Sequence, residues 1–142
     1  MAMKLKNLSL KQFQNLGKSL GMRYRKKAHV IGLIGPLGAG KTTFVKAFAR
    51  ALGIQKISSP SFVVIHQYKF DSRVLFHLDF YRLKKLDQLS VLGLDEILGE
   101  KNVVLIEWVD RFPKVKTRCD LIITIKINAN QTRNVTIQNH KI

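Results

Sequence analysis

Apolar residues recur at helical spacing near the start of the chain. Ser9 and Gln12 have the spacing of a capping box, which predicts a helix that begins after Ser9. The apolar positions that follow are Phe13, Leu16 and Leu20. They predict an amphipathic helix that ends at Gly21.

A strand and a second helix are predicted next. Residues 30–34 form an unbroken apolar run, which is typical of a strand buried on both faces of a parallel sheet. The run leads directly into glycines. From Lys41 a second set of apolar residues recurs at helical spacing, and Gly53 lies where this helix should end.

The remaining pattern predicts hairpins, short helices and one more buried strand. Residues 62–70 and 74–80 form a hairpin around the turn 71–73, and residues 121–127 and 133–138 form another. Residues 86–98 are helical in composition, with a break at Gly93, and residues 103–106 form a fully apolar strand. We expect an α/β fold whose central sheet is mostly parallel, with flanking helices and antiparallel hairpin strands.

Composition limits the class of protein. The 142 residues are 46% hydrophobic and 24% charged, as in ordinary globular proteins, and this length favours a single domain over residues 1–142. The single cysteine, Cys119, excludes an intramolecular disulfide and fits a reducing compartment. We find neither a signal peptide nor an apolar run long enough to span a membrane. We therefore expect a cytoplasmic protein without a membrane partner.

The charge of the chain is high and unevenly distributed. Lys and Arg number 25 against nine Asp and Glu, a formal net charge of +16, and no acidic residue precedes Asp71. Such a field raises the encounter rate with nucleotides, RNA or an acidic protein. A solvated basic surface without a ligand explains the same charges, so the sequence does not decide whether the chain contacts RNA directly. No DNA partner is expected.

Residues 35–42 carry the strongest chemical signal. The segment Gly35-Pro36-Leu37-Gly38-Ala39-Gly40-Lys41-Thr42 matches G-x-x-x-x-G-K-[ST], the phosphate-binding P-loop. The predicted strand before it and helix after it are the context that this motif requires. Glycines let backbone N–H groups turn toward phosphate oxygens, Lys41 supplies a positive charge, and Thr42 can ligate magnesium through its hydroxyl. The sequence thus indicates a P-loop NTPase-like domain that binds ATP or ADP with Mg²⁺.

Two carboxylates are candidates for the magnesium site. A metal-nucleotide site needs an acid at the end of a neighbouring strand, and both Glu107 and Asp79 end predicted strands. We favour Glu107 for the metal because its strand is the more uninterrupted apolar run. Asp79 then orients the attacking water or supports the metal, although the sequence does not order the two roles, and either acid could simply cap a strand.

A serine-rich segment and one tryptophan lie between or beside these motifs. Residues 58–62 contain Ser61 and could form a switch that responds to a terminal phosphate, or a plain Ser-Pro turn. Trp108 follows Glu107 and is either a core residue or a contact for a partner. His66 and His77 lie in predicted strands and are interpreted as packed or surface residues.

Taken together, the motifs resemble those of the TsaE family, also called YjeE. The matching segments are GPLGAGKTT at 35–43, ISSPSF at 57–62, HLDFYRL at 77–83, GLDEI at 93–97 and VVLIEW at 103–108. They follow the order of the family and cover most of residues 30–112. P-loop proteins in general share only the first of them.

The resemblance implies a small bacterial P-loop ATPase that acts with TsaB and TsaD in making threonylcarbamoyladenosine in tRNA. It implies that ATP hydrolysis keeps this assembly turning over, and that the protein is nearly inactive alone. Contact with tRNA through the complex is compatible with the basic charge.

The resemblance also assigns residues. Lys41 is similar to the phosphate-binding lysine, Thr42 and Glu107 to the magnesium residues, and Asp79 to the essential acid. The P-loop through Thr43 would bind the nucleotide, with Ser9 and Arg133 near its base. Trp108 follows the magnesium acid as in the family, and Asp79 and the Ser61 segment would align the attacking water.

Two positions depart from the family pattern. Pro36 stands where the family usually has an acid, which removes a carboxylate near the phosphates and stiffens the loop. Ser61 replaces a common Thr and retains the hydroxyl.

Two other functions remain as alternatives. A small-molecule kinase would need an arginine-rich lid, and only Arg111 and Arg118 lie between Arg82 and Arg133. A non-catalytic, nucleotide-gated RNA-binding switch would bind ATP and RNA without turnover stimulated by a partner.

Overall fold

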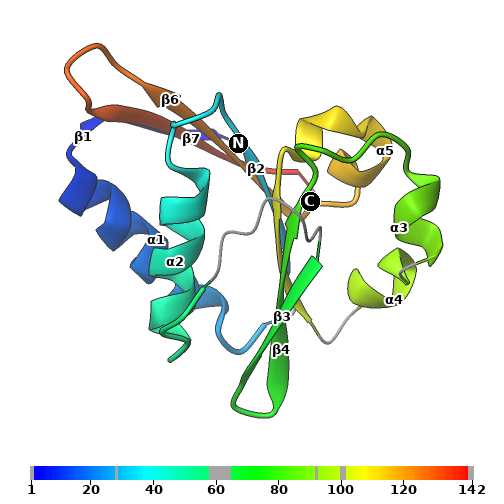
Figure 1. The fold of residues 1–142 in the computed structure, drawn as a ribbon. Coiled ribbons are helices and arrows are strands. Elements are labelled where there is room, and N and C mark those ends of the chain that lie inside the picture. The colour runs from blue at the N-terminus through cyan, green and yellow to red at the C-terminus, as the bar shows by residue number, and fades with distance from the viewer. Residues whose placement is uncertain (1, 28, 58–64, 92, 100–101, 141–142) are drawn as a thin grey trace.

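A seven-stranded sheet organises the molecule, as the computed structural model in Figure 1 shows. The structure describes residues 2–27, 29–57, 65–91, 93–99 and 102–140. The strands are β1 (Ala2–Leu8), β2 (His29–Ile34), β3 (Ile65–Phe70), β4 (Arg73–Asp79), β5 (Val103–Glu107), β6 (Leu121–Ile127) and β7 (Arg133–Asn139). Their order across the sheet is β1-β7-β6-β2-β5-β4-β3.

The centre of the sheet is parallel and its two edges are antiparallel hairpins. β2 pairs in parallel with β5 and β6, and β4 pairs in parallel with β5. All five residues of β5 are buried, because each face of this strand is covered. The α/β fold with a central parallel sheet and hairpin strands, expected from the apolar runs, is therefore confirmed.

The strand β1 was not expected from the sequence pattern. It pairs with β7 in antiparallel fashion, with Ala2 opposite Gln138 and Leu5 opposite Val135. The register shifts between Leu5 and Leu8, where Asn7 has a positive φ of 58°. Because its partner strand lies at the other end of the sequence, no local pattern reveals this pairing.

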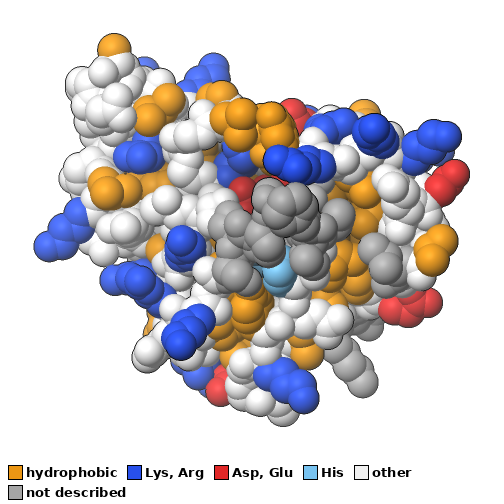
Figure 2. All heavy atoms as spheres, in the orientation of Figure 1, with side chains coloured by type: hydrophobic (Ala, Val, Ile, Leu, Met, Phe, Trp, Pro, Cys, Tyr) orange, Lys and Arg blue, Asp and Glu red, His pale blue; other side chains and the backbone are white. Residues whose placement is uncertain are grey.

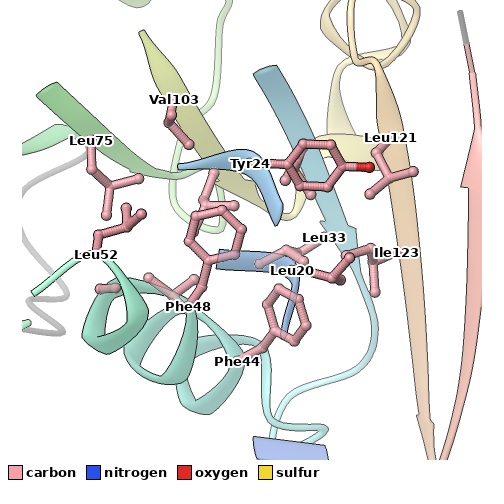
Figure 3. Close-up of a cluster of buried hydrophobic side chains, with 14 of the residues drawn as sticks. Leu20, Tyr24, Leu33, Phe44, Phe48, Leu52, Leu75, Val103, Leu121 and Ile123 are labelled. Carbon is pink, nitrogen blue, oxygen red and sulfur yellow. The ribbon is translucent and has the colours of Figure 1, made fainter. Parts of the chain in front are cut away.

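Two helices cover one face of the sheet, α1 (Leu10–Tyr24) and α2 (Lys41–Ala51). Figure 3 shows Phe44 and Phe48 projecting from α2 toward the strands, among buried side chains that include Leu33 and Leu121. Apolar residues of α1, β2, β5 and β6 complete this cluster. This packing fixes the start of α2 against the ends of the central strands.

The helix α1 is longer than its sequence pattern predicted. The capping box of Ser9 and Gln12 is present, but the helix continues past Gly21 to Tyr24. A Cβ at Gly21 would lie 2.5 Å from the carbonyl oxygen of Phe48, so this glycine permits close contact with α2 and does not end the helix. Tyr24 is buried and stacks on His29, with ring centroids 4.2 Å apart.

Short helices cover the opposite face of the sheet (Figure 1). They are α3 (Asp87–Val91), α4 (Leu94–Ile97), the 3-10 helix η1 (Val109–Arg111) and α5 (Pro113–Lys116). The predicted break at Gly93 is confirmed, since this residue caps α4 with a φ of 83°. η1 and α5 are too short for a helical repeat of apolar residues to be recognised in the sequence. Among the described residues, no helix is long and apolar enough to cross a membrane.

Candidate functional site

The P-loop connects the end of β2 to the start of α2, as predicted. Gly40 caps α2 with a φ of 109°, a backbone region that glycine adopts without strain. A Cβ at this position would also lie 3.0 Å from the ring of Phe13. The first N–H groups of a helix have no partner within the helix, and the first turn of α2 contains no acidic residue. The loop and the helix therefore present a positive end to an anion.

Lys41 turns its side chain back into the loop. Its Nζ donates to the carbonyl oxygens of Gly35 at 2.5 Å and Pro36 at 2.9 Å, and it lies 4.1 Å from the centroid of the Trp108 ring. Lys41 is only 4% exposed, and burial lowers the pKa of its ammonium group. A phosphate oxygen can replace these neutral acceptors and would compensate the buried charge better.

Glu107, at the end of β5, joins the loop to the sheet. The hydroxyl of Thr42 lies 3.1 Å from each carboxylate oxygen of Glu107. Nε2 of His77 lies 2.5 Å from Oε2 of the same carboxylate. Glu107 and His77 are both 3% exposed, so this carboxylate is held from two sides in the interior.

Asp79 lies beside Glu107, because the two residues are partners in the parallel register of β4 and β5. Its Oδ1 accepts a hydrogen bond from the backbone N–H of Tyr81 at 3.0 Å. Burial raises the pKa of Asp79, and the nearby Glu107 adds to this effect, while the Tyr81 N–H, His77 and Lys41 oppose it. Asp79 is thus a carboxylate with increased proton affinity at the edge of the site.

These groups line one pocket of about 330 Å³. Its lining residues are Leu37, Gly38, Gly40, Lys41, Thr42, Thr43, Asp79, Tyr81, Glu107, Trp108 and Arg133. The aromatic rings of Tyr81 and Trp108 lie 4.9 Å apart at its rim, and Arg111 donates to the carbonyl of Tyr81. The carboxyl ends of parallel strands in open α/β sheets are the usual place for a ligand.

The structure brings most of the predicted site residues together. Gly35, Pro36 and Ala39 do not line the pocket, but their carbonyl oxygens hold Lys41 and Arg133. Ser9 is not among the lining residues. It accepts a hydrogen bond from Gln12 at the start of α1, and its contact with a nucleotide base stays a prediction. Ser61 lies outside the described residues.

Trp108 lies at the rim of the pocket. It has a positive φ of 60° just after β5, and its ring is partly exposed above Lys41. It therefore packs partly against the core and also lines the pocket, and its role as a partner contact stays a prediction.

Two residues of the site were missed by the sequence analysis, His77 and Tyr81. His77 was interpreted as a packed or surface histidine; it is packed and only 3% exposed, but its contact with Glu107 was not predicted. Alternation within β4 places His77 on the same face as Asp79, two residues later, which is the signal that could have identified it. Its Nδ1 is buried and has no hydrogen-bond partner among the residues that the structure describes.

The donor set suits a hard divalent cation next to phosphates. Thr42 and Glu107 converge on one point, Asp79 is adjacent, and hydroxyl and carboxylate oxygens are the ligands that Mg²⁺ takes from proteins. Within the described ranges, no group of three or more His, Cys, Asp or Glu forms a metal centre by itself. The site therefore fits a metal held partly by the protein and partly by a nucleotide.

Comparisons with known proteins agree on one family. A family model described as "Threonylcarbamoyl adenosine biosynthesis protein TsaE" matches residues 8–135. The tRNA threonylcarbamoyladenosine biosynthesis protein TsaE of Bacillus subtilis is 40% identical over 114 residues, which cover 80% of this chain and 71% of that protein. TsaE of Aquifex aeolicus is 38% identical over 115 residues, covering 79% and 78% respectively.

A solved structure has the same fold. The crystal structure of YdiB from Bacillus subtilis superposes with a TM-score of 0.74 and 30% sequence identity. The match covers 99% of this chain and 87% of YdiB, so the similarity includes the N-terminal strand and the C-terminal hairpin.

Proposed function

The chain belongs to the TsaE family, and from this membership we propose that it binds and hydrolyses ATP in the machinery that makes threonylcarbamoyladenosine in tRNA. The role in threonylcarbamoyladenosine biosynthesis follows from the family. The proposal adds four refinements: ATP as the substrate, Mg²⁺ as the cofactor, dependence on TsaB and TsaD, and action in the cytoplasm.

One observation carries the proposal for ATP. A single pocket lies at the carboxyl ends of β4 and β5 and the start of α2, and it is lined by Lys41, Thr42, Asp79 and Glu107. A P-loop lysine, a hydroxyl and two acids in this arrangement are the parts that phosphoryl-transfer sites use. On binding, the ammonium of Lys41 would leave the carbonyl oxygens of Gly35 and Pro36 and contact the outer phosphates.

Thr42 and Glu107 would hold the cation from the protein side. When bound, Mg²⁺ neutralises charge on the terminal phosphates. The 3.1 Å contacts between the Thr42 hydroxyl and the Glu107 oxygens already bring the ligand atoms together, and His77 fixes one of these oxygens. These contacts would hold the proposed metal ligands in place for the cation.

Asp79 would position the attacking water. Its carboxylate is partly buried, it faces the same pocket, and its raised pKa makes it a better proton acceptor than a surface aspartate. Ser61 would assist through the switch predicted at residues 58–62.

The partner dependence is proposed from the resemblance together with the rim of the pocket. Leu37 and Tyr81 are exposed and Trp108 is partly exposed, so aromatic and apolar side chains lie at the rim of the pocket. A partner that covers this rim would exclude water and complete the alignment of the reacting groups. We assign the contact at Trp108 to the TsaB–TsaD complex.

The test is phosphate release from ATP by the purified protein, alone and with TsaB and TsaD of the same organism. We expect slow release alone, stimulation by the partners, and loss of the stimulation in Lys41→Ala. Lys11→Ala, an exposed lysine on α1, is the matched control and should behave as the wild type.

Nucleotide binding is measured in the same samples. Trp108 is the single tryptophan and lies 4.1 Å from Lys41, so its fluorescence should change when ATP or ADP binds. Binding without stimulation by the partners would overturn the proposed ATPase role. A phosphorylated product from a panel of nucleosides would instead identify a kinase.

A further inference from the structure

A basic groove lies between α1 and α2, next to the nucleotide pocket. It has a volume of about 150 Å³ and is lined by Gln14, Lys18, Thr43, Lys46, Ala47 and Arg50. Thr43 lines both this groove and the nucleotide pocket, so the two are neighbours. The side chains of Lys18, Lys46 and Arg50 are exposed, and Figure 2 shows Lys and Arg side chains across the side of the molecule that α1 and α2 form.

The groove is narrow because the helices meet through small residues. A Cβ at Gly17 would lie 3.0 Å from Cβ of Ala47, and one at Gly21 would lie 2.5 Å from the carbonyl oxygen of Phe48. Ala47 itself is buried at the base of the groove. The close approach brings Lys18 of one helix near the cations of the other.

The positive charges in the groove are not compensated by acids. Neither α1 nor α2 contains an acidic residue, and none of Lys18, Lys46 and Arg50 forms an ion pair within the described part of the chain. Lys46 and Arg50 are four residues apart on one helix, a spacing at which like charges repel and destabilise the helix. An arrangement that costs stability is expected where an anionic ligand supplies the missing charge.

The groove fits a nucleic-acid backbone better than an acidic protein. Lys, Arg, Gln and Thr are the side chains that contact phosphates, and they make up five of the six lining positions. Protein interfaces are depleted in Lys and rely on aromatic and other large apolar anchors, of which this groove has none among its lining residues.

We propose that the groove between α1 and α2 binds the phosphate backbone of RNA through Lys18, Lys46 and Arg50. This inference deepens the proposed function and rests on it only for the identity of the RNA, which in that pathway is tRNA. The contacts are to phosphates, so they position the RNA without reading its sequence.

The test is the affinity of the full chain for fluorescein-labelled tRNA, measured by anisotropy over a series of KCl concentrations without nucleotide. In Lys18→Gln/Lys46→Gln/Arg50→Gln we expect the slope of log affinity against log salt to become shallower by about 2 to 3, since each lost phosphate contact removes roughly 0.7 to 0.9. At about 0.1 M salt the affinity should fall on the order of 100-fold.

The matched control is Lys4→Gln/Lys6→Gln/Lys126→Gln. These lysines line a second depression of similar volume, about 160 Å³, on β1, β6 and β7, and their substitution changes the net charge by the same amount. We expect this variant to bind within about threefold of the wild type at ~0.1 M salt, where its loss would reflect only the general field of the molecule.

Three results would overturn the inference. Equal losses in the two variants would assign binding to net charge, an unchanged affinity in the first variant would exclude the groove, and displacement of tRNA by polyglutamate at matched charge would favour an acidic protein. Binding of ADP, followed by Trp108 fluorescence in both variants, keeps this test separate from the proposed ATPase. If the protein proves not to hydrolyse ATP, the RNA-binding result still stands. If RNA binding at the groove is excluded, the ATPase proposal still stands.

Discussion

Asp79 and Glu107 lie opposite each other at the ends of β4 and β5, so two carboxylates share one edge of the sheet. Glu107 is held by Thr42 and His77, whereas the side chain of Asp79 has the N–H of Tyr81 as its hydrogen-bond donor in the described structure. The pKa of Asp79 is raised above its ordinary value of 3.8 because burial disfavours the charged form. Ionisation of Asp79 therefore opposes folding. The protonated carboxyl contributes its full stabilisation below about pH 3.8, and this stabilisation is lost as the pH rises through the pKa of the folded state.

Asp79→Asn should separate catalysis from stability. Without the carboxylate we expect partner-stimulated phosphate release to fall by roughly 10²- to 10⁴-fold, the range for loss of a general base. The amide can still accept from the N–H of Tyr81, so the melting temperature at pH 7 should rise. Thermal unfolding between pH 7 and pH 4 measures the melting temperatures of both proteins. The difference in melting temperature between the variant and the wild type should shrink as the pH falls. A melting temperature below wild type at pH 7 would contradict it.

His77 contacts Oε2 of Glu107, one of the two oxygens that the Thr42 hydroxyl also contacts, so it is a positioning residue. His77→Phe would leave a buried carboxylate with one partner fewer, which costs about 1–3 kcal/mol or more for a charged group. Denaturant unfolding measures this loss, and we expect nucleotide affinity with Mg²⁺ to fall more than affinity without it. Equal effects with and without Mg²⁺ would mean that His77 acts on stability alone. His66→Phe, on the partner residue in β3, is the control.

The packing of α1 on α2 depends on the absence of a Cβ atom at two glycines. Gly17 and Gly21 both face α2, and a Cβ at either position would come within 3.0 Å of a neighbouring atom. Glycine usually weakens a helix relative to alanine, so its presence at these two positions reflects the contact and not the helix itself.

Gly21→Ala should therefore destabilise the protein, although the same change in an exposed helix stabilises it. A Cβ there would meet the carbonyl of Phe48 and the Cβ of Ala51, and overpacking of this kind costs about 1–3 kcal/mol. Ser19→Ala, on the exposed side of the same helix, is the control and should be neutral or slightly stabilising. Urea unfolding of both variants measures the change in the free energy of unfolding. A Gly21→Ala variant more stable than the wild type would refute the packing argument.

How far the sequence predicts an element depends on where its partners lie. β2, the P-loop and α2 are adjacent in the chain, so their patterns suffice, and the strands that end in Asp79 and Glu107 are also predicted. The strand β1 pairs with β7 at the far end of the sequence, and the contact of His77 with Glu107 requires the order of strands in the sheet. α1 was predicted to end at Gly21 because a glycine that serves packing looks the same in sequence as one that ends a helix.

At the scale of the whole molecule, the charge of +16 is the dominant property. All nine acids lie between Asp71 and Asp120, so β1, α1, α2 and the hairpin β6–β7 contain basic residues alone among their charged residues. Self-repulsion of such a surface destabilises the compact state and is screened by salt, with a Debye length of about 10 Å at 0.1 M.

The melting temperature should therefore rise between about 10 mM and 200 mM KCl, because added salt shortens the screening length. The rise should be smaller in Lys18→Gln/Lys46→Gln/Arg50→Gln, which removes three of the crowded cations. Calorimetry or circular dichroism in KCl measures both. A melting temperature that falls with KCl would show that attractive ion pairs outweigh repulsion in this protein.

The pairing of β1 with β7 also has a consequence for synthesis of the chain. The strand β1 has as its partner β7, which is synthesised much later in the chain, and Arg133, at the start of β7, lines the proposed nucleotide pocket. A growing chain carries Lys41 and Thr42 about 90 residues before Arg133 is made. The pocket is thus completed by the same late strand that pairs with β1, so a nascent chain forms neither the whole pocket nor the β1–β7 pairing until β7 has been made.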